Sequence, residues 1–147
     1  MKRLLGFLIV LLAVAQQASA AGTVTLTAQA TYGVGDVLRY RYAFAWTSDA
    51  AGAVSGNAQI LQPGRIIQVE YTPDGGGTQP TDLYDATLVY SNSLDLLQGS
   101  GANLSNTTTY GPVFQALYFH DATRTVDLVI ANAGNAKGGT ILIWVGP

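Results

Sequence analysis

The chain has 147 residues, with 7 basic and 9 acidic side chains and no cysteine. This length suits one domain, the lack of cysteine excludes a disulfide framework, and the acidic balance argues against a nucleic-acid partner, which needs clustered lysine and arginine. Charged residues make up only 11% of the chain, against about 25% in typical domains, so the surface must be largely polar but uncharged, as is common on exported proteins that pack against copies of themselves or other proteins.

Residues 1–20 have the pattern of a secretory signal peptide. The start MKR is basic, residues 4–15 are apolar, and residues 18–20 read ASA, a small-residue cleavage site. The apolar run is shorter than the roughly 20 residues of a membrane-spanning helix, so we expect cleavage and no stable membrane insertion afterwards, with an uncleaved anchor as the alternative. We therefore predict an exported protein, periplasmic, extracellular or on the cell surface, with a single domain over residues 21–147.

Two strands are predicted after the signal peptide. Alternation of apolar and polar residues predicts a strand over 24–30 and, after a glycine turn, a longer one over 37–47. One face of the longer strand carries Leu38, Tyr40, Tyr42, Phe44 and Trp46. Arg39 and Arg41 lie on the opposite face, which directs the aromatic side chains towards a core and makes an exposed glycan-stacking platform the alternative.

Six more strands are predicted, separated by turn signals. They cover residues 58–61, 65–72, 82–90, 113–121, 124–131 and 140–145. In the second of these six we expect Ile67, Val69 and Tyr71 to face inwards. The inward face of the fourth stays open between two sets, Phe114 with Tyr118 or Leu117 with Phe119.

One short helical turn is predicted over residues 93–97, capped by Ser93 and ended by Gly99. The rest of the pattern is seven or eight strands without an amphipathic helix of useful length. This pattern predicts an all-β fold, either an antiparallel β-sandwich of jelly-roll or Ig-like type or a partly open barrel.

The sequence offers few catalytic groups. His120 is the single histidine, and Asp121 beside it would point to the other face of a strand, so the two cannot form a relay pair. Asp85 and Asp95 could serve as the carboxylate pair of a glycoside hydrolase, but any chain with nine acids contains such pairs. We therefore predict that the protein is not an enzyme and has no catalytic residue, no metal site and no cofactor.

Three stretches, read in order, resemble a known group of proteins. They are FAWTSDAAGAVSG (Phe44–Gly56), TDLYDATL with LDLLQGSGANLS (Thr81–Ser105) and VIANAGNAKGGTILIWV (Val129–Val145). Together they cover most of the mature chain and resemble small β-rich structural proteins of tailed phages and prophages, here with an added signal peptide. The resemblance implies a virion component of the capsid-decoration, head-fibre or tail-associated type, without catalytic residues.

Two functions remain from the sequence. The first is a non-enzymatic structural or interaction protein, a phage-like virion-surface or exported assembly subunit that binds copies of itself or other virion or surface proteins. Its predicted partner-contact residues lie in the loop after the aromatic strand and are Ser48, Asp49, Val54 and Ser55. The alternative is a secreted glycan- or surface-binding module. Its predicted stacking residues are Tyr32, Tyr110 and Tyr118.

Overall fold

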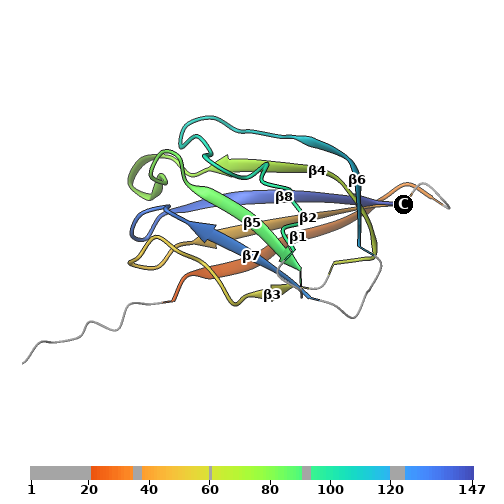
Figure 1. The fold of residues 1–147 in the computed structure, drawn as a ribbon, viewed down its shortest axis with the longest axis horizontal. Helices are drawn as coiled ribbons and strands as arrows, with labels where there is room; N and C mark the ends of the chain where they lie inside the picture. Colours follow the sequence, from red (N-terminus) through yellow and green to blue (C-terminus); the bar gives the residue numbers. More distant parts are fainter. Residues whose placement is uncertain (1–20, 35–37, 60, 91–93, 120–124) are drawn as a thin grey trace, which may run out of the picture.

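Two antiparallel sheets stack face to face in this protein (Figure 1). The computed structural model describes residues 21–34, 38–59, 61–90, 94–119 and 125–147, with the backbone alone for 114–119. The predicted signal peptide and the pair His120 and Asp121 therefore lie outside the described residues. Within the described ranges, no helix combines the length and the hydropathy needed to cross a membrane.

The larger sheet has five strands in the order β1-β2-β8-β4-β6. Their bounds are β1 (Thr23–Tyr32), β2 (Arg39–Thr47), β8 (Gly138–Gly146), β4 (Gly64–Pro73) and β6 (Val113–Phe119). The smaller sheet has the order β3-β7-β5. Its strands are β3 (Ala58–Gln59), β7 (Val126–Ala131) and β5 (Asp85–Tyr90), and a 3-10 turn, η2 (Gly76–Thr78), precedes β5. In the described part of the chain, each of the eight strands falls on one of the predicted strand segments.

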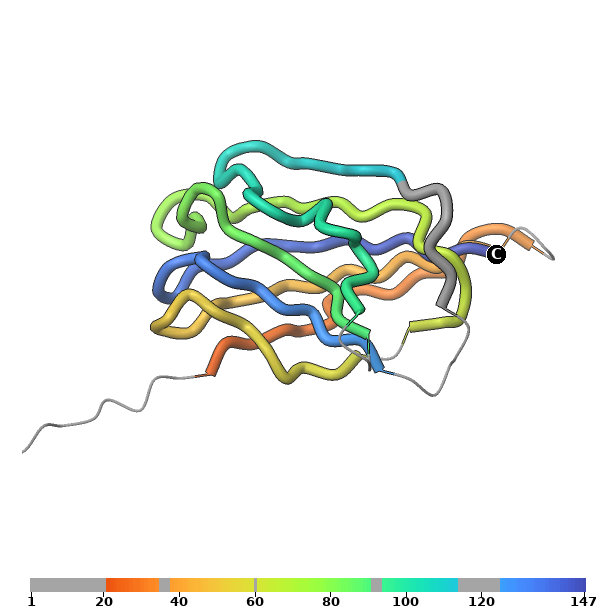
Figure 2. The backbone as a smooth tube through the Cα atoms, viewed as in Figure 1, coloured from red at the N-terminus to blue at the C-terminus, as the bar shows by residue number. Residues whose placement is uncertain are grey.

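The strands pair in a nested order along the chain. β2 pairs with β8, β3 with β7 and β4 with β6. The segment after β5 runs back beside it, with antiparallel bridges from Val89 to Asp95 and from Tyr84 to Leu104 (Figure 2). This nested ribbon is rolled so that β4 also pairs with β8 and β5 with β7, which is the jelly-roll topology. Of the predicted alternatives, the structure thus has the jelly-roll sandwich, with β1 added at one edge.

The aromatic strand β2 forms the floor of the core, as predicted. Tyr42, Phe44 and Trp46 are between 1% and 3% exposed, whereas Arg39 on the other face is exposed. Aliphatic side chains from both sheets pack against these rings, among them Val54, Leu88, Leu128, Ile130, Ile141, Ile143 and Val145. Each large apolar side chain buried in this way stabilises the fold by about 1.5–3 kcal/mol, so the two sheets are held together mainly by apolar contact.

In β4, one predicted inward residue is wrong. Val69 and Tyr71 are buried as expected, but Ile66 is buried in place of Ile67, which is only half-buried. The register of β4 against both of its neighbours shifts between Ile66 and Gln68. This bulge inserts one extra residue, so the alternation of faces reverses at that point.

The segment after β5 forms consecutive turns in place of the predicted helical turn. The amide of Gln98 donates to the carbonyl of Asp95 at 3.3 Å, and that of Ser100 donates to the carbonyl of Leu97 at 2.9 Å. Ser93, the predicted cap, lies outside the described residues. Asp95 takes that role, because its carboxylate accepts the amides of Leu97 and Gly99, each at 2.9 Å.

The bulge in β4 predicts different costs for two neighbouring isoleucines. Ile66→Ala should lower the free energy of unfolding by about 3 kcal/mol, because it leaves a cavity between the sheets. Ile67→Ala should cost no more than about 1 kcal/mol, because this side chain is already partly in water. Urea denaturation of both variants measures the difference. Equal losses would contradict the assignment of Ile66 to the core.

The buried Tyr84 predicts a loss of stability at alkaline pH. Burial raises the pKa of Tyr84 from 10.0 to about 12. The folded state therefore holds this proton more tightly than the unfolded state, so stability is unchanged below pH 10 and falls as the pH rises towards 12, by about 2 kcal/mol. Tyr84→Phe should remove this part of the fall in urea denaturation at pH 10 to 12.

The buried Tyr71, whose pKa is also raised by burial, keeps part of the alkaline fall in the Tyr84→Phe variant. An alkaline fall in Tyr84→Phe equal to that of the unaltered protein would refute the prediction.

Candidate functional site

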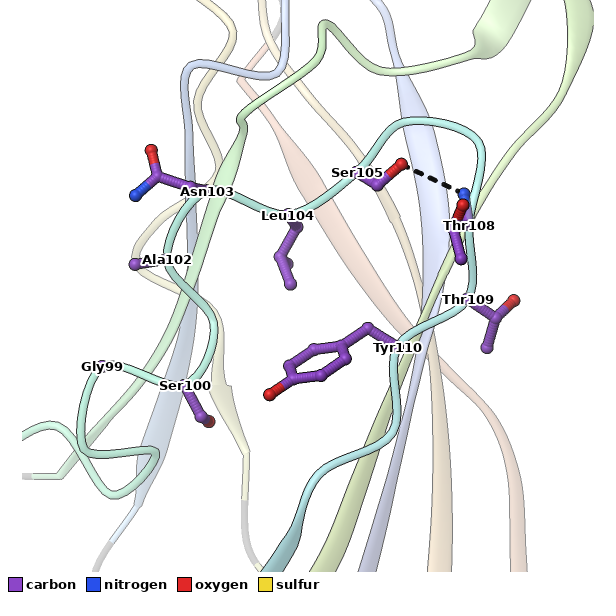
Figure 3. A pocket seen from close by; sticks show the side chains of 9 residues that line it. All are labelled: Gly99, Ser100, Ala102, Asn103, Leu104, Ser105, Thr108, Thr109 and Tyr110. Atoms are coloured by element: carbon purple, nitrogen blue, oxygen red, sulfur yellow. Dashed lines mark hydrogen bonds between the residues drawn. The ribbon is translucent and has the colours of Figure 1, made fainter.

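A pocket of about 450 Å³ lies between the turns that follow β5 and the segment that leads into β6 (Figure 3). Nine residues line it: Gly99, Ser100, Ala102, Asn103, Leu104, Ser105, Thr108, Thr109 and Tyr110. None of these side chains is charged, and six of them carry a hydroxyl or amide group. The pocket is therefore neutral and polar, with one aromatic ring.

That ring belongs to Tyr110, a predicted stacking residue, and it is rigidly supported. The backbone of Tyr110 pairs with that of Tyr71 of β4 through two hydrogen bonds of 2.8 and 3.0 Å. The two rings are nearly parallel, 12° apart, with centroids separated by 6.2 Å. Tyr71 is buried, and its hydroxyl lies 3.4 Å from Oγ of Ser100 in the pocket wall. Tyr110 itself is 48% exposed, so it presents a fixed aromatic surface to the pocket.

Aspartates hold the wall of the pocket in place. Oδ1 of Asp85 accepts the amide of Asn103 at 2.9 Å, and Oδ2 of Asp95 accepts the amide of Gly99 at the same distance. The other oxygen of each carboxylate also accepts a hydrogen bond, from the Asn132 side chain for Asp85 and from backbone amides for Asp95. The two carboxylates considered for hydrolysis thus serve in this structure to fix the turns.

The predicted stacking residue Tyr32 lies at the other end of the larger sheet. It is 47% exposed, and its ring centroid is 5.3 Å from that of Trp144. The guanidinium of Arg41 lies 5.9 Å from the Trp144 ring, in the range of a cation-π contact. Beside these residues is a cavity of about 150 Å³, lined by Arg39, Ile67, Gln68 and Trp144. This end of the sheet is therefore aromatic but cationic.

The sequence pattern does not mark Trp144 as accessible, because it stands in the apolar run of residues 140–145. In β8 it alternates with the buried Ile143 and Val145, so it faces away from the core. The third predicted stacking residue, Tyr118, pairs with Arg65 across β4 and β6, and its side chain is not among those described.

The predicted partner-contact loop is tied to the core. Oγ of Ser48 donates to the carbonyl of Gly134 at 2.6 Å and accepts the amide of Lys137 at 3.0 Å. Val54 is buried and pairs with the backbone of Ile130 through two bonds of 3.0 Å. Ser48 and Val54 are thus buried within the chain, and their contact with a partner stays a prediction.

The rest of that loop is more accessible. Asp49 is half-buried, and its carboxylate accepts the amides of Ala51 and Ala53 at 2.8 Å each. Of the four predicted contact residues, only Ser55 is exposed. Asp49 therefore closes the turn, and Ser55 is the one side chain of the four that a partner could reach freely.

Among the residues that the structure describes, no three histidine, aspartate or glutamate side chains are grouped so that they could hold a metal ion. Comparisons with protein-family models, with curated proteins and with solved structures find no match to this chain. The phage resemblance and the predicted export therefore stay predictions, and the function has to be inferred from the geometry of the chain itself.

Proposed function

We propose that this protein is a structural or interaction subunit, exported or carried on a virion surface, that binds protein surfaces and is not an enzyme. The partner that the geometry favours is a second copy of the chain. The observation that supports this proposal is the edge strand β1, which has ten residues and pairs only with β2 among the described strands.

An unprotected edge strand is able to pair with another chain. The outer edge of a sheet carries backbone N–H and C=O groups without partners, and proteins usually protect such edges with charged side chains, proline, a bulge or a short strand. β1 reads TVTLTAQATY and contains no charge and no proline, and none of its residues is buried. Of these protective features, β1 has only a bulge, between Leu26 and Ala28. β1 is thus suited to add a strand from another molecule.

The inner face of β1 also extends beyond the smaller sheet. Gly22 lies so close to the carbonyl of Ala53 that a Cβ would have no room, and Val24 packs against the core. Leu26, however, is 42% exposed although it pairs with the buried Phe44. A second β1 would bring apolar surface against this side chain and remove it from water.

The choice of a second copy rests on the neutrality of the strand. Two β1 strands related by a two-fold axis would pair antiparallel, and equivalent side chains would face one another near that axis. Like charges in opposite positions destabilise such a pair. Because β1 has no charge, it can pair with itself without repulsion, and the low charge of the whole chain favours close approach of two copies.

A charge placed on β1 should weaken self-association. In sedimentation velocity at increasing concentrations, the purified protein should shift from monomer to dimer. Thr25→Lys should raise the dissociation constant by about tenfold or more, because it places a lysine on the pairing edge. The matched control is Thr140→Lys in β8. Thr140 lies in the same row across the sheet, through Ala45, but two strands from the edge.

The control variant should associate like the unaltered protein. A protein that stays monomeric at every concentration would contradict self-association as a whole. Equal weakening by both lysines would place the contact on the face of the sheet and away from the β1 edge.

A further inference from the structure

We propose that the pocket at Tyr110 binds a neutral saccharide, with one sugar ring stacked on the tyrosine. This function is separate from the self-association proposed for β1. The backbone of Tyr110 pairs with Tyr71 of β4, and the strands β2 and β8 lie between β4 and β1 in the sheet. A dimer formed through β1 would therefore leave the pocket open.

The aromatic ring offers the first contact. A sugar ring has one face of C–H groups that packs on an aromatic face, while its hydroxyls point to the sides. Tyr110 is half exposed, and the parallel ring of the buried Tyr71 fixes its orientation. The ring points towards Ser100 across the pocket (Figure 3). A volume of about 450 Å³ lies within the range of small-molecule sites, roughly 300–1,000 Å³.

The lining determines the class of ligand. Ser100, Asn103, Ser105, Thr108 and Thr109 can donate and accept hydrogen bonds, as a set of sugar hydroxyls requires. No lysine or arginine lines the pocket, so a phosphate or carboxylate ligand would find no opposite charge there. The chemistry thus favours an uncharged polyhydroxylated ligand over a nucleotide or an acidic peptide.

The wall of the pocket is fixed before any ligand arrives. Asp85 and Asp95 each bind an amide of the wall, as described above, and Nε2 of Gln79 donates to the carbonyl of Asn106 at 2.9 Å. Gly101 is buried against the carbonyl of Ala86, where a Cβ would have no room. A rigid site loses little conformational entropy on binding, so it can bind a ligand that makes few contacts, such as a single sugar ring.

Tyr32 provides a matched control, because it has nearly the same exposure as Tyr110. Its ring contacts Trp144 beside the cationic Arg41, and it does not line a neutral pocket. A general preference of sugars for exposed tyrosines would involve both residues. Binding at the pocket would involve Tyr110 alone.

The test is a nuclear magnetic resonance titration of the full protein with maltotriose, cellotriose and chitotriose at millimolar concentrations. At least one of these should shift amide signals of residues 99–110. Tyr110→Ala should weaken this binding by about tenfold or more, whereas Tyr110→Phe, which keeps the ring, and Tyr32→Ala should change it little. Ala102→Gln should also weaken binding, because it places a larger side chain in the lining of the pocket and leaves both stacked tyrosines in the sequence.

Two results would overturn the proposal. One is the absence of shifts with all three saccharides, and the other is an equal loss of affinity in Tyr32→Ala and Tyr110→Ala. The Ala102→Gln variant decides the case if Tyr110→Ala does not fold. Sedimentation of the same samples shows separately whether self-association through β1 holds, so either proposal can fail without the other.

Discussion

The larger sheet is wider than the smaller sheet that covers it, and this mismatch determines the rest of the structure. Five strands face three, so the smaller sheet cannot cover both margins of the larger one. On one side, β1 is mostly exposed, and no described strand pairs with its outer edge. On the other side, the segment that follows β5 packs against β4 as a set of turns. The proposed binding surfaces both arise where the two sheets fail to match.

Turns in a partly buried position require partners for their backbone amides, because an unpaired amide away from water is costly. In this protein the side chains of Asp85 and Asp95 accept hydrogen bonds from backbone amides of the turns. In a regular strand, the carbonyl groups of a neighbouring strand would accept such bonds. Asp82 adds a third such bond, to the amide of Asn106 at 3.3 Å. The side chains of Asp82, Asp85 and Asp95 thus all accept amides of the segment that follows β5, and the pocket wall is the ordered result.

The sequence predicted those features that depend on local alternation. The faces of β2 and the positions of the other strands follow from period-two patterns, which hold wherever a strand is regular. Ile66 was misplaced because a bulge reverses the pattern, and the bulge depends on pairing with two distant strands. The burial of Ser48 also depends on distant residues, since its partners Gly134 and Lys137 come from a loop far along the chain. Tyr110 was recognised as a candidate, but its support by Tyr71 depends on tertiary pairing that the sequence does not display.

The two proposals are independent, but together they have a further consequence. Pairing of two β1 strands would merge two five-stranded sheets into one of ten. Seven strand spacings would then separate the two β4 strands, which at about 4.8 Å per spacing is roughly 34 Å. Each β4 carries one Tyr110 pocket, so a dimer would present two sugar sites at a fixed separation. A neutral, shallow site binds a single sugar weakly, but two linked sites on one glycan-covered surface raise the effective affinity without any new contact. Self-association through the uncharged edge strand would therefore raise the affinity for a glycan-covered surface, even though each pocket binds a single sugar weakly.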